Sequence, residues 1–301
     1  MPGGPEVKAS LLWDCQCRLG EGTVWNEADA SIYFVDILGR EVLALTPATG
    51  RQRRWTMPQR IGWLVPRASG GWLAGLQQGV VALALDSDGG GGVRIEWLHR
   101  LHDADSTLRL NDAMVDGHGR LWFGSMDGAD ETRPAGRLYR LDTDGSLAVV
   151  DEGYCVTNGP TFSPDGRTLY HTDSARRAVY AFDLDDAGRL SRKRTWLEFD
   201  ADEGYPDGMT TDAAGRLWIA HWGGARVTCR DAADGRVLQT VALPVPQVTN
   251  VCFGGSGLRD LFITSARRGL EGDLLGQASY SGGLFRVADA GPGRATDTAA
   301  C

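Results

Sequence analysis

The segment Thr211–Trp218 reads Thr-Asp-Ala-Ala-Gly-Arg-Leu-Trp, and a strand-like segment, Ala225–Cys229, follows it. Together they form a unit with a tight Asp/Gly turn, an aromatic strand, a second turn and a further strand. Gly and Asp favour turns, whereas aromatic and β-branched residues favour strands. Similar phrases stand at Phe162–Tyr170 (Phe-Ser-Pro-Asp-Gly-Arg-Thr-Leu-Tyr) and Val115–Trp122 (Val-Asp-Gly-His-Gly-Arg-Leu-Trp). The chain therefore repeats one small all-β unit.

The repeat extends over nearly the whole chain. A fourth clear copy is Trp25–Tyr33, and two weaker copies are Pro66–Trp72 and Phe253–Phe262. Their spacing of about 40 to 50 residues is the length of one four-stranded propeller blade. We therefore predict an all-β fold, a six-bladed β-propeller with a central metal site that forms a single domain over residues 1–301. An open pair of β-sandwiches is the alternative, but it does not explain a sustained period of this length.

The two ends of the chain have different predicted roles. A propeller must close its ring of sheets, and the strand-like segment Ala9–Trp13 precedes the first full unit. We expect this segment to supply the outer strand of the last blade, because closure removes an exposed sheet edge. The segment from about residue 290 to Cys301 is rich in Gly, Pro and Ala, and we expect a mobile tail there.

Charge and apolar pattern argue against several classes of partner. The formal net charge is -8, and the sequence lacks the clustered Lys and Arg that binding the phosphates of a polyanion such as nucleic acid requires. No apolar run approaches the roughly 18 residues of a membrane span, and the N-terminus lacks the pattern of a signal peptide. We therefore expect a cytoplasmic protein with a small-molecule ligand, no nucleic-acid or membrane partner, and a monomeric or weakly homo-oligomeric state.

Polar residues recur at the start of each predicted innermost strand, where side chains should point toward the central channel. Aligning the copies on their turns gives this position as Glu21, Ile61, Asn111, Asn158, Asp207 and Asn250. Five of the six carry a side-chain oxygen. Asn and Asp are common in turns, so each alone has a structural explanation. Glu is a poor turn former, however, and turn chemistry does not explain a ring of oxygens.

Converging carboxylates and amide oxygens need a partner. They would repel one another or stay unsatisfied unless a cation lay between them. An all-oxygen ligand set without Cys or His favours Ca²⁺, Mg²⁺ or Mn²⁺ over a structural zinc site. The sequence therefore predicts one divalent metal on the propeller axis.

The motifs around these positions resemble those of one known family. They are Leu19-Gly-Glu21-Gly, Arg109-Leu-Asn111-Asp112, Thr157-Asn158-Gly159-Pro160 and Tyr205-Pro206-Asp207-Gly208-Met209. In all six units the chain is similar to the SMP-30/gluconolactonase/regucalcin family, in a pattern nearest to that of bacterial sugar lactonases.

The resemblance implies roles for five residues. Glu21, Asn158 and Asp207 would be the protein ligands of one divalent metal, and Arg109 with Asn111 would hold substrate hydroxyl groups. It further implies hydrolysis of a sugar-acid lactone, such as glucono-, xylono- or arabinonolactone, to the aldonic acid. Ca²⁺ is the expected ion, and Zn²⁺, Mn²⁺, Mg²⁺ and Fe²⁺ are the alternatives.

Four further positions are left open. The family's acidic residue on the loop after the third blade's Met has three candidates here, Asp127, Asp130 and Glu131. Asn250 is a candidate for a contact with the metal ligands or the substrate.

For catalysis, we expect Asp207 to accept the proton of the attacking water. The sequence contains no Gly-x-Ser-x-Gly motif, which argues against a covalent serine mechanism. His221 could lie near the mouth of the channel as a base, but we interpret it and His171 as packing or hydrogen-bonding residues.

Other functions fit parts of the same pattern. A calcium-binding protein without turnover would use the same metal site, although Arg109 and Asn111 count against pure buffering. A propeller that serves only as an interaction scaffold needs no acidic axis. A paraoxonase-like esterase would share the architecture and the metal but needs an apolar pocket, and Trp63, Tyr205 and Trp222 suit either pocket.

Overall fold

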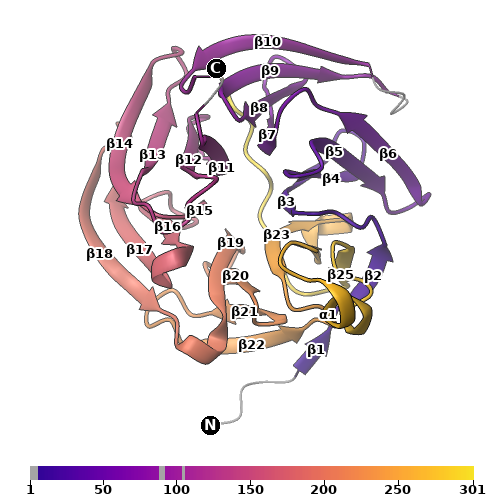
Figure 1. The fold of residues 1–301 in the computed structure, drawn as a ribbon. Helices are drawn as coiled ribbons and strands as arrows, with labels where there is room; N and C mark the ends of the chain where they lie inside the picture. Colours follow the sequence, from indigo (N-terminus) through magenta and orange to yellow (C-terminus); the bar gives the residue numbers. More distant parts are fainter. Residues whose placement is uncertain (1–5, 88–91, 104–105) are drawn as a thin grey trace.

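The computed structural model describes residues 6–87, 92–103 and 106–301. In this part of the chain the strands form six sheets arranged around a central axis, which confirms the six-bladed β-propeller (Figure 1). In each blade, four strands follow one another outward from the axis, with antiparallel pairing. The innermost strands are β3 (Gly20–Asn26), β7 (Ile61–Pro66), β11 (Leu108–Val115), β15 (Thr157–Phe162), β19 (Tyr205–Thr211) and β23 (Val248–Gly254).

The outer strands complete the blades. Those of the first three blades are β4 (Ser31–Asp36), β5 (Glu41–Thr46), β6 (Arg51–Thr56), β8 (Trp72–Leu76), β9 (Gly79–Leu85), β10 (Val93–Arg100), β12 (Leu121–Asp127), β13 (Gly136–Leu141) and β14 (Leu147–Tyr154). Those of the last three are β16 (Thr168–Asp173), β17 (Ala178–Leu184), β18 (Leu190–Glu198), β20 (Leu217–Trp222), β21 (Arg226–Arg230), β22 (Val237–Ala242), β24 (Asp260–Ser265) and β25 (Leu284–Val287). The helical segments are η1 (Ser174–Arg176), η2 (Ala201–Glu203), η3 (Ser256–Leu258) and α1 (Gly272–Gln277).

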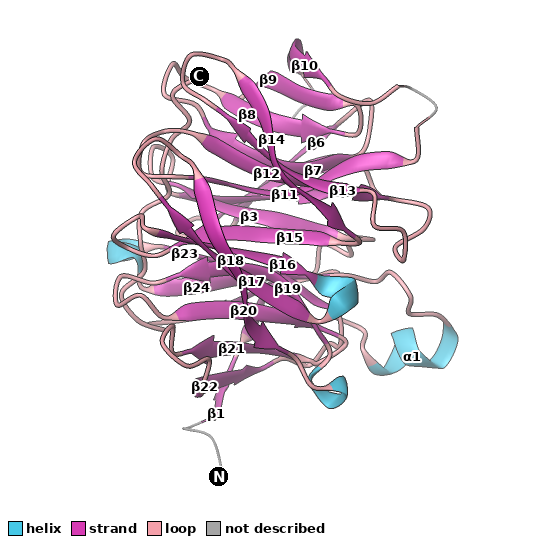
Figure 2. Cartoon of the chain, turned by 90° about the vertical axis from the view of Figure 1, so that its left-hand side faces the viewer, coloured by secondary structure: helices cyan, strands magenta, loops and turns pink. Residues whose placement is uncertain are grey.

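Helices contribute little to this fold. Figure 2 shows α1 projecting at the right of the view, to the side of the stacked strands. With six residues α1 is the longest helix of the described segments, and none of their helices has the length and apolar character to cross a membrane.

The N-terminal segment closes the ring as expected. Strand β2 (Ser10–Trp13) pairs antiparallel with β25 and becomes the outer strand of the sixth blade. The sequence did not indicate a second contact, in which β1 (Glu6–Lys8) pairs in parallel with β22 of the fifth blade. The segment therefore joins two neighbouring blades.

The recurring Asp of the repeat stabilises its own turn. Asp212 accepts hydrogen bonds from the backbone N–H of Arg216, from Arg216 Nε at 2.7 Å and from the buried Trp218 Nε1 at 3.0 Å. Asp116 makes the equivalent contacts in the third blade. One carboxylate thus holds the backbone of the turn, the Arg side chain and the buried Trp ring. This explains why the sequence Asp-x-x-x-Arg-x-Trp recurs.

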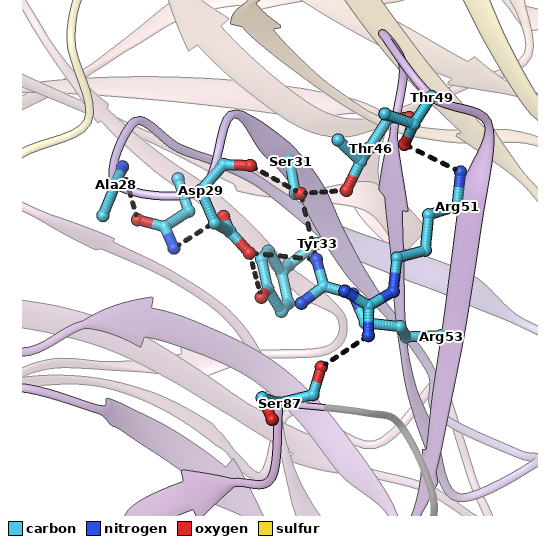
Figure 3. Close-up of polar contacts among 10 residues, drawn as sticks. Ala28, Asp29, Ser31, Tyr33, Thr46, Thr49, Arg51, Arg53 and Ser87 are labelled. Atoms are coloured by element: carbon cyan, nitrogen blue, oxygen red, sulfur yellow. Dashed lines mark hydrogen bonds and ion pairs between the residues drawn. The ribbon is translucent and has the colours of Figure 1, made fainter.

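The first blade has a related polar cluster, drawn in Figure 3. Asp29 Oδ2 accepts hydrogen bonds from the Tyr33 hydroxyl at 2.7 Å and from Arg53 Nη2 at 2.9 Å. Arg53 Nη2 also donates to Ser31 Oγ at 2.9 Å, and its guanidinium lies over the Tyr33 ring. Because Arg53 is on the outermost strand, this cluster joins the outer edge of the blade to its first turn.

The C-terminal segment crosses the end of the propeller where the innermost strands finish, as the yellow trace in Figure 1 shows. Ala299 is fully buried, donates to Pro66 O at 2.9 Å and accepts from Ala68 N at 2.8 Å. Ala300 N donates to Gly119 O at 3.0 Å. These contacts do not support the expected mobile tail, because the segment's backbone groups are paired with turns of several blades.

Candidate functional site

A β-bulge near the start of each innermost strand positions the polar ring. On β3, Glu21 pairs with Val35 and Val24 with Tyr33, so β3 has one residue more than β4 between these pairs. The same shift occurs in the other five innermost strands. A bulge bends a strand and redirects its side chains. All six aligned ring positions lie at or inside these bulges, and the bulges turn polar side chains toward the axis.

A cavity of 380 Å³ lies at this end of the axis. Its lining includes the five predicted site residues, namely Glu21, Arg109, Asn111, Asn158 and Asp207. They come from four different blades, and each of these residues has only 3% to 6% of its surface exposed. The structure therefore brings together residues that are far apart in the sequence, and it encloses polar groups that need partners.

Hydrogen bonds fix the two amides of the cavity. Arg109 Nη1 donates to Asn111 Oδ1. Asn111 Nδ2 donates to Asn158 Oδ1 at 2.9 Å, and Asn158 Nδ2 donates to Ser174 Oγ at 2.8 Å. An amide oxygen has two lone pairs, so Asn158 Oδ1 retains one for a further partner. This series of hydrogen bonds therefore leaves one lone pair of the Asn158 oxygen free to bind a further group, such as a cation.

Three carboxyl groups, those of Glu21, Asp112 and Asp207, are buried together at the site. Burial, together with Asp112, raises the pKa of Glu21 to about 8, and burial raises the pKa of Asp112 to about 7. Burial also raises the pKa of Asp207 well above its usual value, with Glu21 and Asp112 adding to the effect. Burial lowers the pKa of Arg109 to about 10. Such a group of carboxylates is costly to ionise without a cation between them.

The donor set fits a hard divalent cation. Carboxylate and amide oxygens are the ligands that Ca²⁺ and Mg²⁺ prefer. Within residues 6–87, 92–103 and 106–301, no group of three or more His, Cys, Asp and Glu side chains is arranged to hold a metal ion. The predicted set of Glu21, Asn158 and Asp207 has only two such side chains and relies on an amide as its third ligand, so the metal stays a prediction.

A second polar layer lies beneath the cavity; the sequence indicated Asn250 as a candidate contact of the metal ligands but no role for Asp112. Asp112 Oδ2 accepts hydrogen bonds from Gly159 N at 2.9 Å and Asn250 Nδ2 at 3.3 Å. Asn250 Oδ1 accepts from Thr23 Oγ1 at 2.7 Å, and Asn250 also hydrogen-bonds the Glu21 carboxylate. Asn250 does not line the cavity. It links the first, third and sixth blades directly below the candidate metal ligands.

The structure separates the three acidic candidates on the loop after β12. Asp127 accepts hydrogen bonds from backbone N–H groups of its own turn, and Asp130 accepts from Thr132. Glu131 lines the cavity and forms an ion pair with Arg268 at 2.6 Å. Of the three, Glu131 is the one placed at the cavity.

Only some of the aromatic and histidine candidates lie at the cavity. Tyr205 and Trp222 line the cavity, whereas Trp63 lines a small pocket farther along the axis. His221 is buried and contacts a backbone carbonyl and a threonine hydroxyl, both at 2.8 Å. His171 is buried in an aromatic contact with Tyr154. Neither histidine lines the cavity, in agreement with their interpretation as structural residues.

Comparisons with known proteins agree with this fold. The family described as the SMP-30/Gluconolactonase/LRE-like region matches residues 19–267. Regucalcin from Oryctolagus cuniculus is 35% identical over 95% of both chains. Pentonolactonase XacC from Haloferax volcanii is 35% identical over 93% of this chain and 94% of its own. The crystal structure of a calcium-binding regucalcin from Agrobacterium tumefaciens has a TM-score of 0.92 over 99% of both chains, and its 24% identity bears on the fold alone.

Proposed function

Because the chain belongs to the SMP-30/gluconolactonase/regucalcin family, we propose that it hydrolyses a sugar-acid lactone to the aldonic acid with the help of one divalent metal ion. The similarity to a pentonolactonase supports sugar-lactone hydrolysis in general. Glucono-, xylono- and arabinonolactone are the substrates that we propose. The observation that carries the proposal is the single cavity that joins three oxygen ligands to the Arg109–Asn111 pair.

Glu21, Asn158 and Asp207 would hold the metal, and their oxygen donors favour Ca²⁺. When bound there, the ion would polarise the lactone carbonyl and balance the negative charge that develops on its oxygen. The second polar layer supports this assignment, because Asn250 contacts the Glu21 carboxylate and Asp112 contacts the backbone next to Asn158.

The protein side chains would perform the remaining steps. Arg109 and Asn111 are hydrogen-bonded to each other, and they would orient the sugar hydroxyls at the wall of the cavity. An Asp207 carboxylate oxygen would accept a proton from the water that attacks the carbonyl carbon. The C–O bond of the ring then breaks, and the proton passes to the departing ring oxygen, which becomes the new hydroxyl of the aldonic acid.

The test is acid release from a panel of aldonolactones by chelator-treated protein, with and without added divalent ions and with spontaneous hydrolysis subtracted. We expect turnover of at least one pentono- or hexonolactone that depends on the ion. Ca²⁺ binding by calorimetry without turnover of any lactone would contradict the proposal. That result would instead favour a metal-binding role like that of the calcium-binding regucalcin from Agrobacterium tumefaciens.

A further inference from the structure

A second hollow, of 630 Å³, lies beside the cavity and contains three arginines, Arg18, Arg40 and Arg60. They come from three separate connections near the start of the first and second blades. The rest of its described lining is neutral, including the amides of Gln59 and Gln78. Because a hollow lined by guanidinium groups and no carboxylate has a positive potential, it contrasts with the acidic cavity next to it.

The two hollows share a rim. The position that a Cβ on Gly128 would take is 3.3 Å from both Arg60 Nη1 and Arg109 Cδ, so the Arg60 guanidinium lies beside the Arg109 side chain. On the other side, Arg18 O accepts a hydrogen bond from Arg268 N at 3.0 Å, and Arg268 lines the cavity. A molecule bound in the cavity can therefore extend past Arg109 into the second hollow.

These guanidinium groups are not neutralised by the protein. Arg18 Nη1 donates to the backbone carbonyl of Leu38 at 3.3 Å. Within the described segments, neither Arg18, Arg40 nor Arg60 has a carboxylate within 4.0 Å. Most other arginines that border a hollow here are paired, as Arg268 is with Glu131. Three unpaired guanidinium groups in one hollow are ready to bind an anion.

We propose that this hollow binds an anionic group, phosphate or carboxylate, on the end of the substrate far from the lactone carbonyl. The proposal rests on the proposed lactonase function and narrows its substrate class to lactones of sugar-acid phosphates or of sugar diacids. Guanidinium groups donate only, and their planar geometry matches carboxylate and phosphate oxygens. A neutral sugar hydroxyl can accept a hydrogen bond from a guanidinium group, but it brings no negative charge to balance three of them.

The chain's formal net charge of -8 strengthens this reasoning. An anionic substrate would meet a repulsive surface over much of the protein, so it needs a local positive region to approach the acidic cavity. Arg60 supplies that charge at the rim beside Arg109, and Arg18 and Arg40 add to it within the hollow. The same charges would hold the anionic end while Arg109 and Asn111 contact the hydroxyls.

The test compares three lactones, D-glucono-1,5-lactone, its 6-phosphate and D-glucaro-1,4-lactone, by kcat/KM at a fixed metal concentration. We expect at least one anionic lactone to be preferred over the neutral one. Arg60→Gln and Arg40→Gln should each reduce that preference by about tenfold, whereas Arg94→Gln, an exposed arginine on β10, should not. Preference for the phosphate alone or the diacid alone identifies the anion. Equal use of all three lactones, or a preference that neither variant changes, would overturn the inference.

A binding measurement separates this inference from the lactonase proposal. Equilibrium binding of 6-phosphogluconate should exceed that of gluconate and should weaken in Arg60→Gln. If no lactone is hydrolysed but this difference is found, the anion site stands and the lactonase proposal fails. If gluconolactone is hydrolysed and both acids bind equally, the lactonase proposal stands and the anion site is overturned.

Discussion

His171 on β16 gives the fold a specific sensitivity to acid. Its side chain is fully buried, and both ring nitrogens have no hydrogen-bond partner within the described segments. Burial lowers the pKa of its imidazole to about 3 from an ordinary value of 6.5. The ring packs edge to face against Tyr154, with 4.7 Å between centroids. The substitution His171→Phe retains an aromatic ring at this position but removes the titrating group.

The pKa difference predicts the direction and the size of the effect. Above pH 6.5 the imidazole is neutral in both the folded and the unfolded chain, so it adds no pH dependence. Between pH 6.5 and 3 only the unfolded chain takes up the proton, and the free energy of unfolding falls by about 1.4 kcal/mol per pH unit. From pH 6.5 to pH 5 the loss amounts to about 2 kcal/mol.

Equilibrium urea unfolding at pH 7.5, 6 and 5 measures this effect. At pH 7.5 we expect His171→Phe to be within about 1 kcal/mol of the wild type, because it removes unpaired polar atoms but adds volume. At pH 5 the variant should be more stable than the wild type by about 2 kcal/mol. Substitution of the exposed His118 by Gln is the control. A wild type and a His171→Phe variant with parallel pH dependence would refute the reasoning.

Three further predictions concern the tail, the first blade and the layer below the cavity. Deleting residues 293–301 should lower the Tm in calorimetry, since it removes the buried Ala299 contacts; an unchanged Tm would show that they contribute nothing. Arg53→Met should lower the free energy of unfolding by about 1 to 3 kcal/mol in urea, because it removes the ion pair with Asp29 and the hydrogen bond to Ser31; a loss below about 0.5 kcal/mol would contradict this. Asn250→Ala should weaken Ca²⁺ binding in calorimetry by about tenfold or more, because it removes a hydrogen bond to Glu21; wild-type affinity would count against a positioning role.

The repeat in the sequence was sufficient to predict the propeller. In the third and fifth blades the turn Asp, the following Arg and the buried Trp form one hydrogen-bonded unit, so these copies carry their own local structure. The closing strand followed from the need to pair a sheet edge, and β2 meets that expectation. The parallel pairing of β1 and the position of the tail had no such signal, because both depend on backbone hydrogen bonds to distant turns.

The candidate site was predictable where the repeat fixed the register. Glu21 and Asn158 occupy equivalent positions just before the bulges of their strands, and Asp207 lies one position later, inside its bulge. An alignment of turns was therefore enough to group them to within one residue. Asp112 was not grouped with them, because simple alternation places it on the face opposite Asn111, and only the bulge in β11 brings it toward the axis. Arg60 lies in a loop contact that the period of the repeat does not encode.

We propose that this cavity catalyses hydrolysis with Asp207 as the proton acceptor, and the kinetics of Asp207→Asn distinguish this role from metal binding alone. The amide retains an oxygen for the metal but cannot take up the proton. With Ca²⁺ binding verified by calorimetry and the lactone at saturation, we predict that kcat falls by at least about a hundredfold. Asp144→Asn, on the exposed turn between β13 and β14, should leave kcat unchanged. An Asp207→Asn variant that keeps more than about a third of the wild-type kcat would contradict the assignment.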